Sequence, residues 1–301
     1  MNLFNKLIAT LLPFVPKSIV REVSARYIAG DSIADAVRTV RNLNSEGAMA
    51  TVDVLGEFIK NLDEAEENTR YSIQVLEAIE REKIDSNLSI KLTSLGLDID
   101  QNICERNVRR ILDAARLHGD IFVRFDMENS PYTSLTIDLY DKLRKEYPNI
   151  GVVLQAYLRR TESDIKRLLA GGATNLRICK GIYIESEEIA FKGREEIRDN
   201  FTKCVDLALS CGAYVGIATH DEVLVESGKK IVKHLGLDKN KYEFQMLLGV
   251  RESMRRQIIS EGHRLRVYVP FGADWYGYSV RRLKENPSVA GHIVKAMFER
   301  K

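Results

Sequence analysis

Short apolar runs alternate with amphipathic segments from Leu88 onward, and this alternation limits the possible folds more than any other feature of the sequence. The seven clearest runs have the length and composition of buried strands, and they cover 88–96, 121–126, 151–158, 175–181, 213–220, 242–249 and 265–272. The segments between them repeat apolar residues at helical spacing. Strands and helices in regular alternation predict a parallel sheet that is buried on both faces.

Two further features decide between a closed barrel and an open sheet. An open nucleotide-binding sheet usually carries a G-x-G-x-x-G or Walker A motif after an early strand, and the sequence has neither. Polar residues instead stand in or directly after almost every strand, where a barrel would bring them to one mouth. We therefore predict a distorted (βα)8 TIM-type barrel, with its eighth strand near 189–191 in a poorly patterned segment.

The first third of the chain has a helical pattern, because the segments 32–43, 50–62 and 65–82 carry apolar residues at helical spacing. We expect residues 1–84 to form a helical region packed on a catalytic barrel of residues 85–301, in one structural domain. A final helix is expected to lie over the barrel mouth. The apolar segment 3–15 is too short to span a bilayer, so we interpret it as a helix packed on the domain; peripheral contact with a membrane is the alternative.

The composition excludes several classes of protein. The chain has 301 residues, of which 45% are apolar and 29% charged, and these are the proportions of an ordinary soluble globular protein. The net charge is +2 and no basic stripe with interleaved aromatic residues is present, so nucleic acid is not an expected partner. The four cysteines include no C-x-x-C pair, which favours a reduced cytoplasmic setting, with the inner face of the membrane as the place of any peripheral contact.

A candidate anion site lies in the segment RVYVPFGADWYGYSVRRLKENP near the C-terminus. One face of the helix predicted there carries Tyr278, Arg281, Arg282 and Glu285. One interpretation is a solvated face with an Arg281–Glu285 pair worth about 0.3 kcal/mol. We favour the other interpretation, because an aromatic residue accompanies two adjacent arginines at the expected mouth. Two neighbouring guanidinium groups can form a forked clamp for a carboxylate.

Asp126 and Lys91 come at or near the ends of two neighbouring predicted strands. Asp126 could simply cap the following loop, or it could face a cationic group of a substrate and tune Lys91. The neighbours of Lys91 are apolar, and a lysine in such a place is costly unless it is paired or lines a polar mouth. We therefore favour a functional role for both residues.

Arg177 and Lys180 surround another strand end, and Gly181 follows them directly. Two cations at a barrel mouth suit an anionic cofactor such as a reduced flavin ring or a pyrophosphate. A glycine at that point would let the backbone approach a ligand closely. Gln155 offers an amide to the edge of a heterocycle, and the alternative is a buried amide that is hydrogen-bonded within the core.

The segment ATHDE (218–222) suggests a metal site at first sight, but its His, Asp and Glu are consecutive, so their side chains point apart. No H-E-x-x-H motif or second histidine at ligand spacing is present. We therefore predict no metal.

Eight segments, taken in their order along the chain, resemble the proline dehydrogenase family in its monofunctional bacterial form. They are LGE (55–57), SIKLTSLG (89–96), RFDMENS (124–130), LQAYLRR (154–160), LRICKGIY (176–183), ATHD (218–221), EFQML (243–247) and RVYVPFG…YSVRRLKEN (266–286). Each motif alone is weak, but the ordered set is specific and covers most of the chain.

The resemblance implies a distorted barrel that binds FAD at its mouth and oxidises L-proline to Δ1-pyrroline-5-carboxylate by hydride transfer to the flavin N5. By this resemblance Lys91, Arg281 and Arg282 hold the proline carboxylate. The residues implied to shape the pocket for the ring are Tyr268, Tyr278 and Leu247.

The other roles implied by the resemblance concern the catalytic centre, the cofactor and a gate. Asp126 is similar to the carboxylate associated with Lys91, Arg177 to the residue that faces the flavin N5 region, and Glu57 to a gate that pairs with the first arginine of the clamp. The residues implied to contact or lie near the flavin are Met127, Gln155, Lys180, Gly181, Ile182, Thr219, His220 and Glu285.

The sequence departs from the family at Ile182, where alanine is frequent, and segment 185–200 shows no clear strand. The resemblance implies a quinone or other electron acceptor and a separate pyrroline-5-carboxylate dehydrogenase that takes the product. Two other functions are the alternatives: a catalytically silent proline-binding or regulatory barrel, and a metal-assisted barrel hydrolase or aldolase. The set of charged residues disfavours the first, and the lack of a ligand set disfavours the second.

Overall fold

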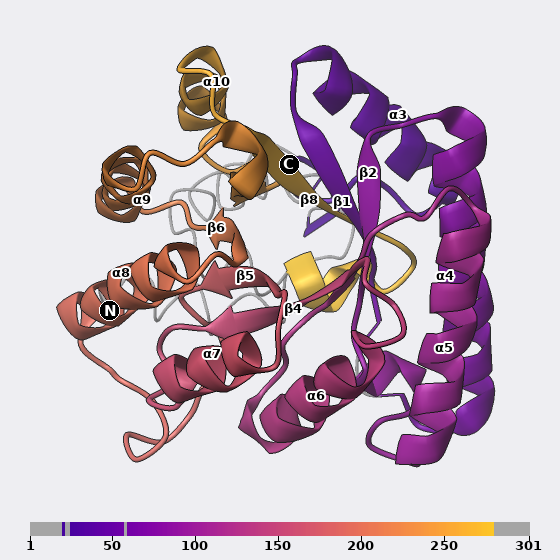
Figure 1. Cartoon of the computed structure of the whole chain (residues 1–301). Coiled ribbons are helices and arrows are strands. Elements are labelled where there is room, and N and C mark those ends of the chain that lie inside the picture. Colours follow the sequence, from indigo (N-terminus) through magenta and orange to yellow (C-terminus); the bar gives the residue numbers. More distant parts are fainter. Residues whose placement is uncertain (1–19, 22–24, 57–58, 280–301) are drawn as a thin grey trace, which may run out of the picture.

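Eight parallel strands close into a barrel in a computed structural model of the chain, which describes residues 20–21, 25–56 and 59–279. Each strand pairs with the next, and β8 returns to pair with β1, so the sheet has no free edge (Figure 1). The strands are β1 (Met49–Val54), β2 (Ser86–Ile90), β3 (Val123–Phe125), β4 (Ile150–Gln155), β5 (Asn175–Cys179), β6 (Tyr214–Ala218), β7 (Tyr242–Leu247) and β8 (Leu265–Phe271).

Helices connect the strands and surround the barrel (Figure 1). They are α3 (Ile33–Ser45), α4 (Leu62–Glu82), α5 (Gln101–Leu117), α6 (Ser130–Leu143), α7 (Thr161–Ala170), α8 (Arg194–Ser210), α9 (Glu222–His234) and α10 (Glu252–Ser260), with short 3-10 turns η2 (Thr93–Leu95) and η3 (Lys239–Lys241). Several begin at a polar cap; for example, Ser32 and Asp35 form a capping box at α3. Asp100 caps α5 and Asp221 caps α9 in the same way, by accepting bonds from backbone N–H groups.

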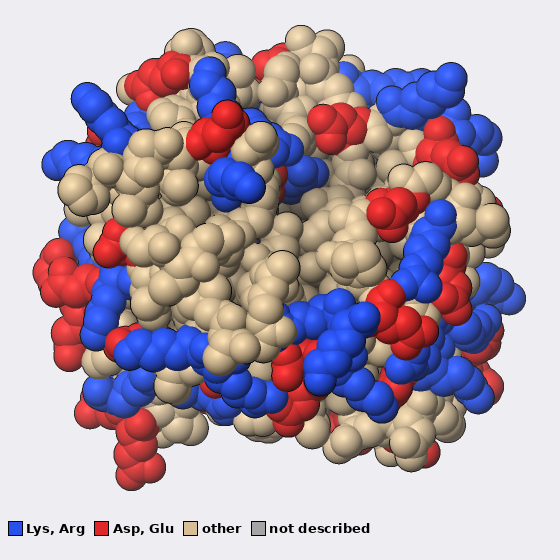
Figure 2. Space-filling view, viewed as in Figure 1, with Lys and Arg blue, Asp and Glu red and all other residues tan. Residues whose placement is uncertain are grey.

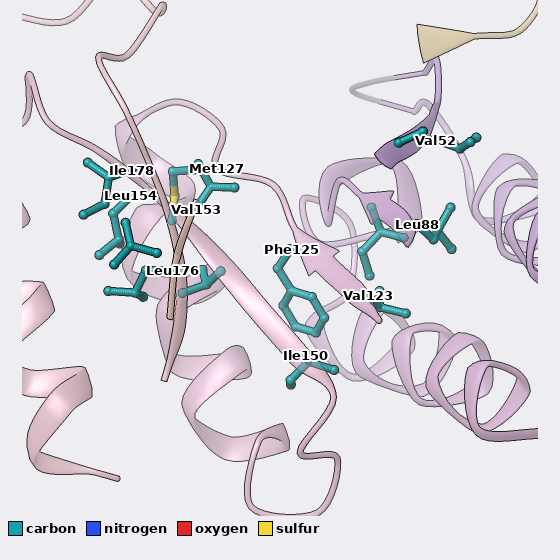
Figure 3. Packing of buried hydrophobic residues seen from close by; sticks show 14 of the residues in the cluster. Val52, Leu88, Val123, Phe125, Met127, Ile150, Val153, Leu154, Leu176 and Ile178 are labelled. Carbon is teal, nitrogen blue, oxygen red and sulfur yellow. The ribbon is translucent and has the colours of Figure 1, made fainter. Parts of the chain in front are cut away.

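The apolar core lies between the barrel and the helices. Alternate residues of each strand point outward, and these include Val52, Leu88, Phe125 and Ile178, all nearly inaccessible to solvent. Figure 3 shows part of this cluster, where β1 to β5 lie side by side; β6, β7 and β8 also contribute to the cluster. Because the helices cover this layer completely, the strands read as apolar runs in the sequence.

The interior of the barrel is polar. Arg266 places its Nε 2.8 Å from Glu243 Oε1 and donates from Nη1 to the Ala50 carbonyl at 2.7 Å. On the other side of the interior, Arg124 donates to the side chain of Asn175 at 2.7 Å. Buried charges of this kind are tolerated only when they are paired and hydrogen-bonded.

The (βα)8 barrel and the seven strands from residue 88 onward are confirmed. The eighth strand is not near 189–191, where only an isolated antiparallel bridge joins Leu158 and Ala190. It is β1, in the segment 50–62 that the pattern assigned to a helix. The residues of β1 that point into the barrel, Thr51 and Asp53, are polar. The few apolar residues left in this short segment fit helical spacing as well as strand spacing.

The first strand of the barrel therefore lies within residues 1–84, and the prediction that this part is a purely helical region beside the barrel is wrong. The predicted helices at 32–43 and 65–82 are present as α3 and α4. The predicted N-terminal helix at 3–15 lies outside the described residues. Residues 275–279 are helical, and the rest of the helix predicted over the mouth also lies outside the described part. None of the helices that the structure describes has the length and apolar character needed to cross a bilayer.

Removing the charge of Glu243 should destabilise the barrel. The Glu243→Gln variant leaves Arg266 buried without a counter-charge, so we expect the free energy of unfolding at pH 7 to fall by about 3 kcal/mol, as measured by urea denaturation. Asp138→Asn removes an exposed charge paired with Arg167 and serves as the control, which should change little.

The Glu243→Gln variant should also change how the free energy of unfolding depends on pH. Burial alone would raise the pKa of Glu243, but Arg266 and the hydrogen bonds to this carboxylate lower the pKa to about 2, from 4.5 in the unfolded chain. The stability that the carboxylate contributes is present above pH 4.5 and is lost as the pH falls toward 2. The difference in free energy of unfolding between wild type and Glu243→Gln should therefore decrease as the pH falls from 4.5 toward 2. A difference that stays constant over this range would contradict the lowered pKa of Glu243.

Candidate active site

Asp126 is the centre of a hydrogen-bonded cluster at the mouth of the barrel. It directly follows β3, and its Oδ1 accepts bonds from Ser89 Oγ at 2.7 Å and from Arg177 Nη1 at 2.6 Å. Its Oδ2 accepts a bond from the Tyr268 hydroxyl at 2.6 Å. These side chains come from four strands or their ends, which a barrel brings to one place. Figure 2 shows the face of the molecule seen in Figure 1, with basic side chains around a depression near its middle.

The pKa of Asp126 follows from these partners. Burial alone would raise it, but the cations of Arg177 and Lys91 and the bonds from Tyr268 and Ser89 together hold the pKa of Asp126 below its usual value. Burial and the neighbouring Asp126 carboxylate raise the pKa of Tyr268 well above its usual value. Asp126 is therefore an ionised acceptor and Tyr268 a neutral donor at neutral pH.

Lys91 lies between two buried carboxylates. Its Nζ is 2.6 Å from Asp53 Oδ1, at the end of β1, and 4.0 Å from Asp126 Oδ2. The Tyr268 hydroxyl is 3.4 Å from the same nitrogen. The lysine side chain is 10% exposed, so its ammonium group is almost completely withdrawn from water yet lies at the mouth. The predicted association of Lys91 with Asp126 is present, and Asp53 is a second and closer partner.

The surroundings shift the pKa values of Asp53 and Asp126 in opposite directions. Burial and the nearby Asp126 charge raise the pKa of Asp53 to about 6, although the Lys91 cation opposes this shift. Its Oδ2 atom has no hydrogen-bond partner within the described part of the chain. Pairs of titratable groups whose surroundings drive their pKa values apart are typical of catalytic centres, and Asp53 and Asp126 form such a pair.

Two predicted cofactor residues after β3 and at the end of β4 are packed in the interior. Gln155 donates from Nε2 to the Glu128 carbonyl at 2.8 Å and is buried. Met127 is part of the buried apolar cluster. The side chain of Glu128 accepts bonds from both the backbone N–H and the hydroxyl of Thr93, which joins the loops after β2 and β3.

A second group of charges lies after β5 and β6. Lys180 Nζ is 3.3 Å from Asp221 Oδ2, and Arg198 on α8 forms two hydrogen bonds with the same carboxylate, at 2.8 and 3.0 Å. Burial alone would raise the pKa of Asp221, but these two cations lower it. Thr219 accepts a bond from the Asp221 N–H at 3.1 Å, so this predicted cofactor residue shapes the same turn.

His220 and Leu247 are in direct contact. The backbone N–H of Leu247 donates to His220 Nε2 at 2.8 Å, so this nitrogen is an acceptor and the ring proton is on Nδ1. Two residues predicted separately for cofactor and substrate are thereby joined across β6 and β7.

The glycine of the KG motif has a different immediate role from the one expected. Gly181 has φ +106°, and a Cβ atom there would lie 2.7 Å from Tyr157 Cγ. Glycine is required both for the left-handed backbone and for the packing of this ring. The next residue, Ile182, is 46% exposed, and Glu185 fixes the loop by accepting bonds from the N–H and the hydroxyl of Ser130, each at 2.7 Å.

Four predicted site residues lie outside the described residues, namely Glu57, Arg281, Arg282 and Glu285. Tyr278 is described and is buried. The structure therefore brings together Lys91, Asp126, Arg177 and Tyr268 from the predicted set, and it places Lys180, Thr219, His220 and Leu247 on neighbouring strand ends.

The sequence pattern did not predict Asp53, Ser89, Arg198 or the contacts of Gln245. Asp53 was not predicted because its strand lies in a segment with a helical pattern. Each strand–helix unit of the barrel has a similar length, so one unit counted back from β2 would have placed a strand near Asp53. Among the described residues no group of three His, Cys, Asp or Glu side chains is arranged to hold a metal ion.

Comparison with known proteins assigns the family. Residues 36–295 match the family model described as proline dehydrogenase. Proline dehydrogenase 2 of Bacillus subtilis (strain 168) is 40% identical over 277 residues, which are 92% of this chain and 91% of that protein. The chain belongs to the proline dehydrogenase family. Another member, the proline dehydrogenase of Deinococcus radiodurans, is 35% identical over 282 residues, which cover 92% of this chain and 90% of that protein.

Larger proteins contain a related part. The Escherichia coli (strain K12) bifunctional protein PutA is 25% identical over 323 residues, which cover 91% of this chain and 24% of that protein. The crystal structure of proline utilization A (PutA) from Bdellovibrio bacteriovorus, inactivated by N-propargylglycine, superimposes with a TM-score of 0.82 at 24% identity. The superposition covers 88% of this chain and 33% of the PutA chain. This family member therefore shares its fold with that part of PutA.

We expect the Asp53 carboxyl to titrate near pH 6 in the folded protein, as measured by carbon NMR with Asp53→Asn to assign the signal. Because the folded-state pKa lies above the unfolded value of 3.8, the protonated form is favoured by folding. The stability linked to this proton is fully present below pH 3.8 and is lost as the pH rises through 6. A titration midpoint below pH 4 would show that Lys91 outweighs burial.

Proposed function

We propose that this protein is an FAD-dependent proline dehydrogenase that oxidises L-proline to Δ1-pyrroline-5-carboxylate. The observation that carries the proposal is the buried cluster in which Asp126 orients Arg177 and Tyr268 beside Lys91, in a chain that belongs to the proline dehydrogenase family. Two proteins that it is similar to, over 92% of this chain and at least 90% of their own lengths, are called proline dehydrogenases.

The mouth suits a zwitterionic amino acid. Lys91 is a nearly buried cation, and Asp53 and Asp126 compensate its charge together with that of Arg177. The described part of the site is thus neutral, so a substrate carboxylate would need further cations from the protein. We propose that Arg281 and Arg282 supply them, with Glu57 as the gate of the first arginine and Tyr278 and Leu247 beside the ring.

The donor set also fits a flavin. Arg177 is held by Asp126, and Lys180 with Arg198 forms a second cationic group around Asp221, which suits a ring that becomes anionic and a diphosphate. His220 is held with its donor on Nδ1. We propose that these residues hold FAD with Gln155, Met127, Gly181, Ile182, Thr219 and Glu285. When bound, FAD supplies a two-electron acceptor for the hydride of the substrate.

The residues of the chain would act mainly by placing charges. Lys91 and the arginines of the clamp fix the carboxylate, and Tyr268 presents an aromatic face and a fixed hydroxyl beside it. Holding the substrate in one orientation removes a large part of the entropic barrier. Asp126 keeps Arg177 in a fixed position, so that its positive charge stands where negative charge develops.

We further propose that electrons pass to a quinone or a similar acceptor, and that a separate pyrroline-5-carboxylate dehydrogenase consumes the product. A cytoplasmic location with peripheral contact at the inner face of the membrane fits an acceptor of this kind. Flotation of the protein with anionic and neutral vesicles would test that contact.

The proposed function is tested by the colour of the purified protein. We expect it to be yellow, or to become yellow after reconstitution with FAD, and to be bleached by L-proline without oxygen as the flavin is reduced. D-proline and glycine serve as controls and should leave the spectrum unchanged. A colourless protein that FAD cannot reconstitute would refute the proposal.

The Lys91→Met variant should bind proline poorly. The side chain keeps its length but loses the cation, so we expect the KM for proline to rise about tenfold or more while FAD content is unchanged. Lys142→Met removes an exposed lysine on α6 and is the matched control, which should behave as wild type. An unchanged KM in Lys91→Met would remove Lys91 from the substrate site.

A further inference from the structure

The buried amide of Gln245, on β7, joins two charged groups inside the barrel. Its Oε1 accepts a bond from Arg177 Nε at 2.5 Å, and its Nε2 donates to Glu243 Oε1 at 2.5 Å. We propose that Gln245 is a positioning residue for Arg177 and so sets how well the site stabilises a reduced flavin. The proposal rests on the function proposed above.

An amide meets both demands. Arg177 requires an acceptor and Glu243 requires a donor, and the side chain of glutamine has one of each at the correct separation. A carboxylate in this place would face Glu243 with like charge, and a lysine could not accept from Arg177. Gln245 thus links the buried Glu243–Arg266 ion pair to Arg177, so the position of the pair fixes the position of Arg177.

Glu243, which accepts the hydrogen bond from the Gln245 amide, is itself held in place. Glu243 is held by Arg266 at 2.8 Å and by the Tyr214 hydroxyl at 2.8 Å, and it is almost completely buried. Because an ionised carboxylate only accepts hydrogen bonds, Gln245 must turn its NH₂ group toward Glu243. Its oxygen then points to Arg177, and the two ends of the amide cannot be exchanged.

The neighbouring strand leaves room for the amide. Gly216 on β6 pairs in register with Glu243, and a Cβ atom at Gly216 would lie 2.8 Å from Gln245 Cδ. A glycine inside a strand usually marks a place where another group approaches closely. The approaching group here is the side chain that holds Arg177.

The bond from Gln245 determines the orientation of the Arg177 guanidinium. Nε donates to Gln245, Nη1 donates to Asp126 at 2.6 Å, and the group lies over the Tyr268 ring at 5.2 Å from its centroid. Two directional bonds fix the plane of a guanidinium group, whereas one allows it to rotate. Losing Gln245 should therefore displace the charge of Arg177 without removing it.

The test compares Gln245→Met with wild type. We expect kcat for proline to fall about tenfold or more, because a catalytic charge is misplaced, and the KM to change by less than about twofold. The reduced flavin should bind about tenfold more weakly relative to the oxidised form, which makes the midpoint potential about 30 mV more negative. Thr51→Val, which removes another buried hydrogen bond inside the barrel, to Asn87, is the control and should leave the potential unchanged.

Gly216→Ala provides a second route, because it keeps the amide but pushes it from its place; it should shift the potential in the same direction. If the folded variants keep the wild-type potential and kcat, the proposal is overturned. If Gln245→Met does not fold, Gly216→Ala decides the question by the same criterion.

A third measurement does not need the cofactor. In protein labelled with ¹⁵N-arginine, the Arg177 Nε–H should exchange with solvent slowly in wild type and at least about tenfold faster in Gln245→Met. Rapid exchange in wild type would overturn the positioning role. A wild-type protein that protects this proton but neither binds flavin nor oxidises proline would instead refute only the proposed function.

Discussion

The ion pairing of Asp126 is the interaction on which the rest of the site depends. Asp126 joins residues from β2, β5 and β8 in one cluster, through Ser89, Arg177 and Tyr268. Without this carboxylate, the partners of the buried Arg177 cation within the described residues would be the neutral Gln245 amide and the Tyr268 ring. Tyr268 would also lose the acceptor of its hydroxyl. The cost of an unpaired buried charge is several kcal/mol, so the members of the cluster stabilise one another.

A polar barrel interior requires an apolar layer elsewhere. The barrel places its interior charges on one set of alternating strand positions and leaves the other set to pack under the helices. The outward residues, such as Leu88 and Ile178, are completely buried there and supply most of the hydrophobic stabilisation. The proposed site residues and the apolar core thus occupy opposite faces of the same strands. Interior charges that lie outside the site, such as the Glu243–Arg266 pair, still contribute to stability.

This division explains what the sequence predicts well. The outward positions are uniformly apolar, so seven strands are visible in the pattern and the barrel follows from their polar ends. Strand β1 is the exception, because Thr51 and Asp53 interrupt its apolar run and it lies among helices. The predicted site residues were recognised from their places in or directly after strands, as for Arg177 within β5 and Lys91 after β2. Local patterns do not reveal residues whose contacts join different strands, such as Asp53 and Gln245. Their partners, Lys91 and Arg177, lie 38 and 68 residues away along the chain.

Two strand glycines connect the interior charges to the backbone. A Cβ atom at Gly151 on β4 would lie 2.7 Å from the Asn175 carbonyl oxygen and also against Arg124, and one at Gly216 would collide with Gln245. Glycine weakens a strand by about 0.5–1 kcal/mol relative to alanine, so its presence at both places needs a compensating gain. That gain is the space for a long polar side chain to pass over the glycine and reach its partner on the next strand but one. The backbone of the sheet is therefore adapted to its charged interior, and each of these glycines is part of the arrangement that holds the polar network in place.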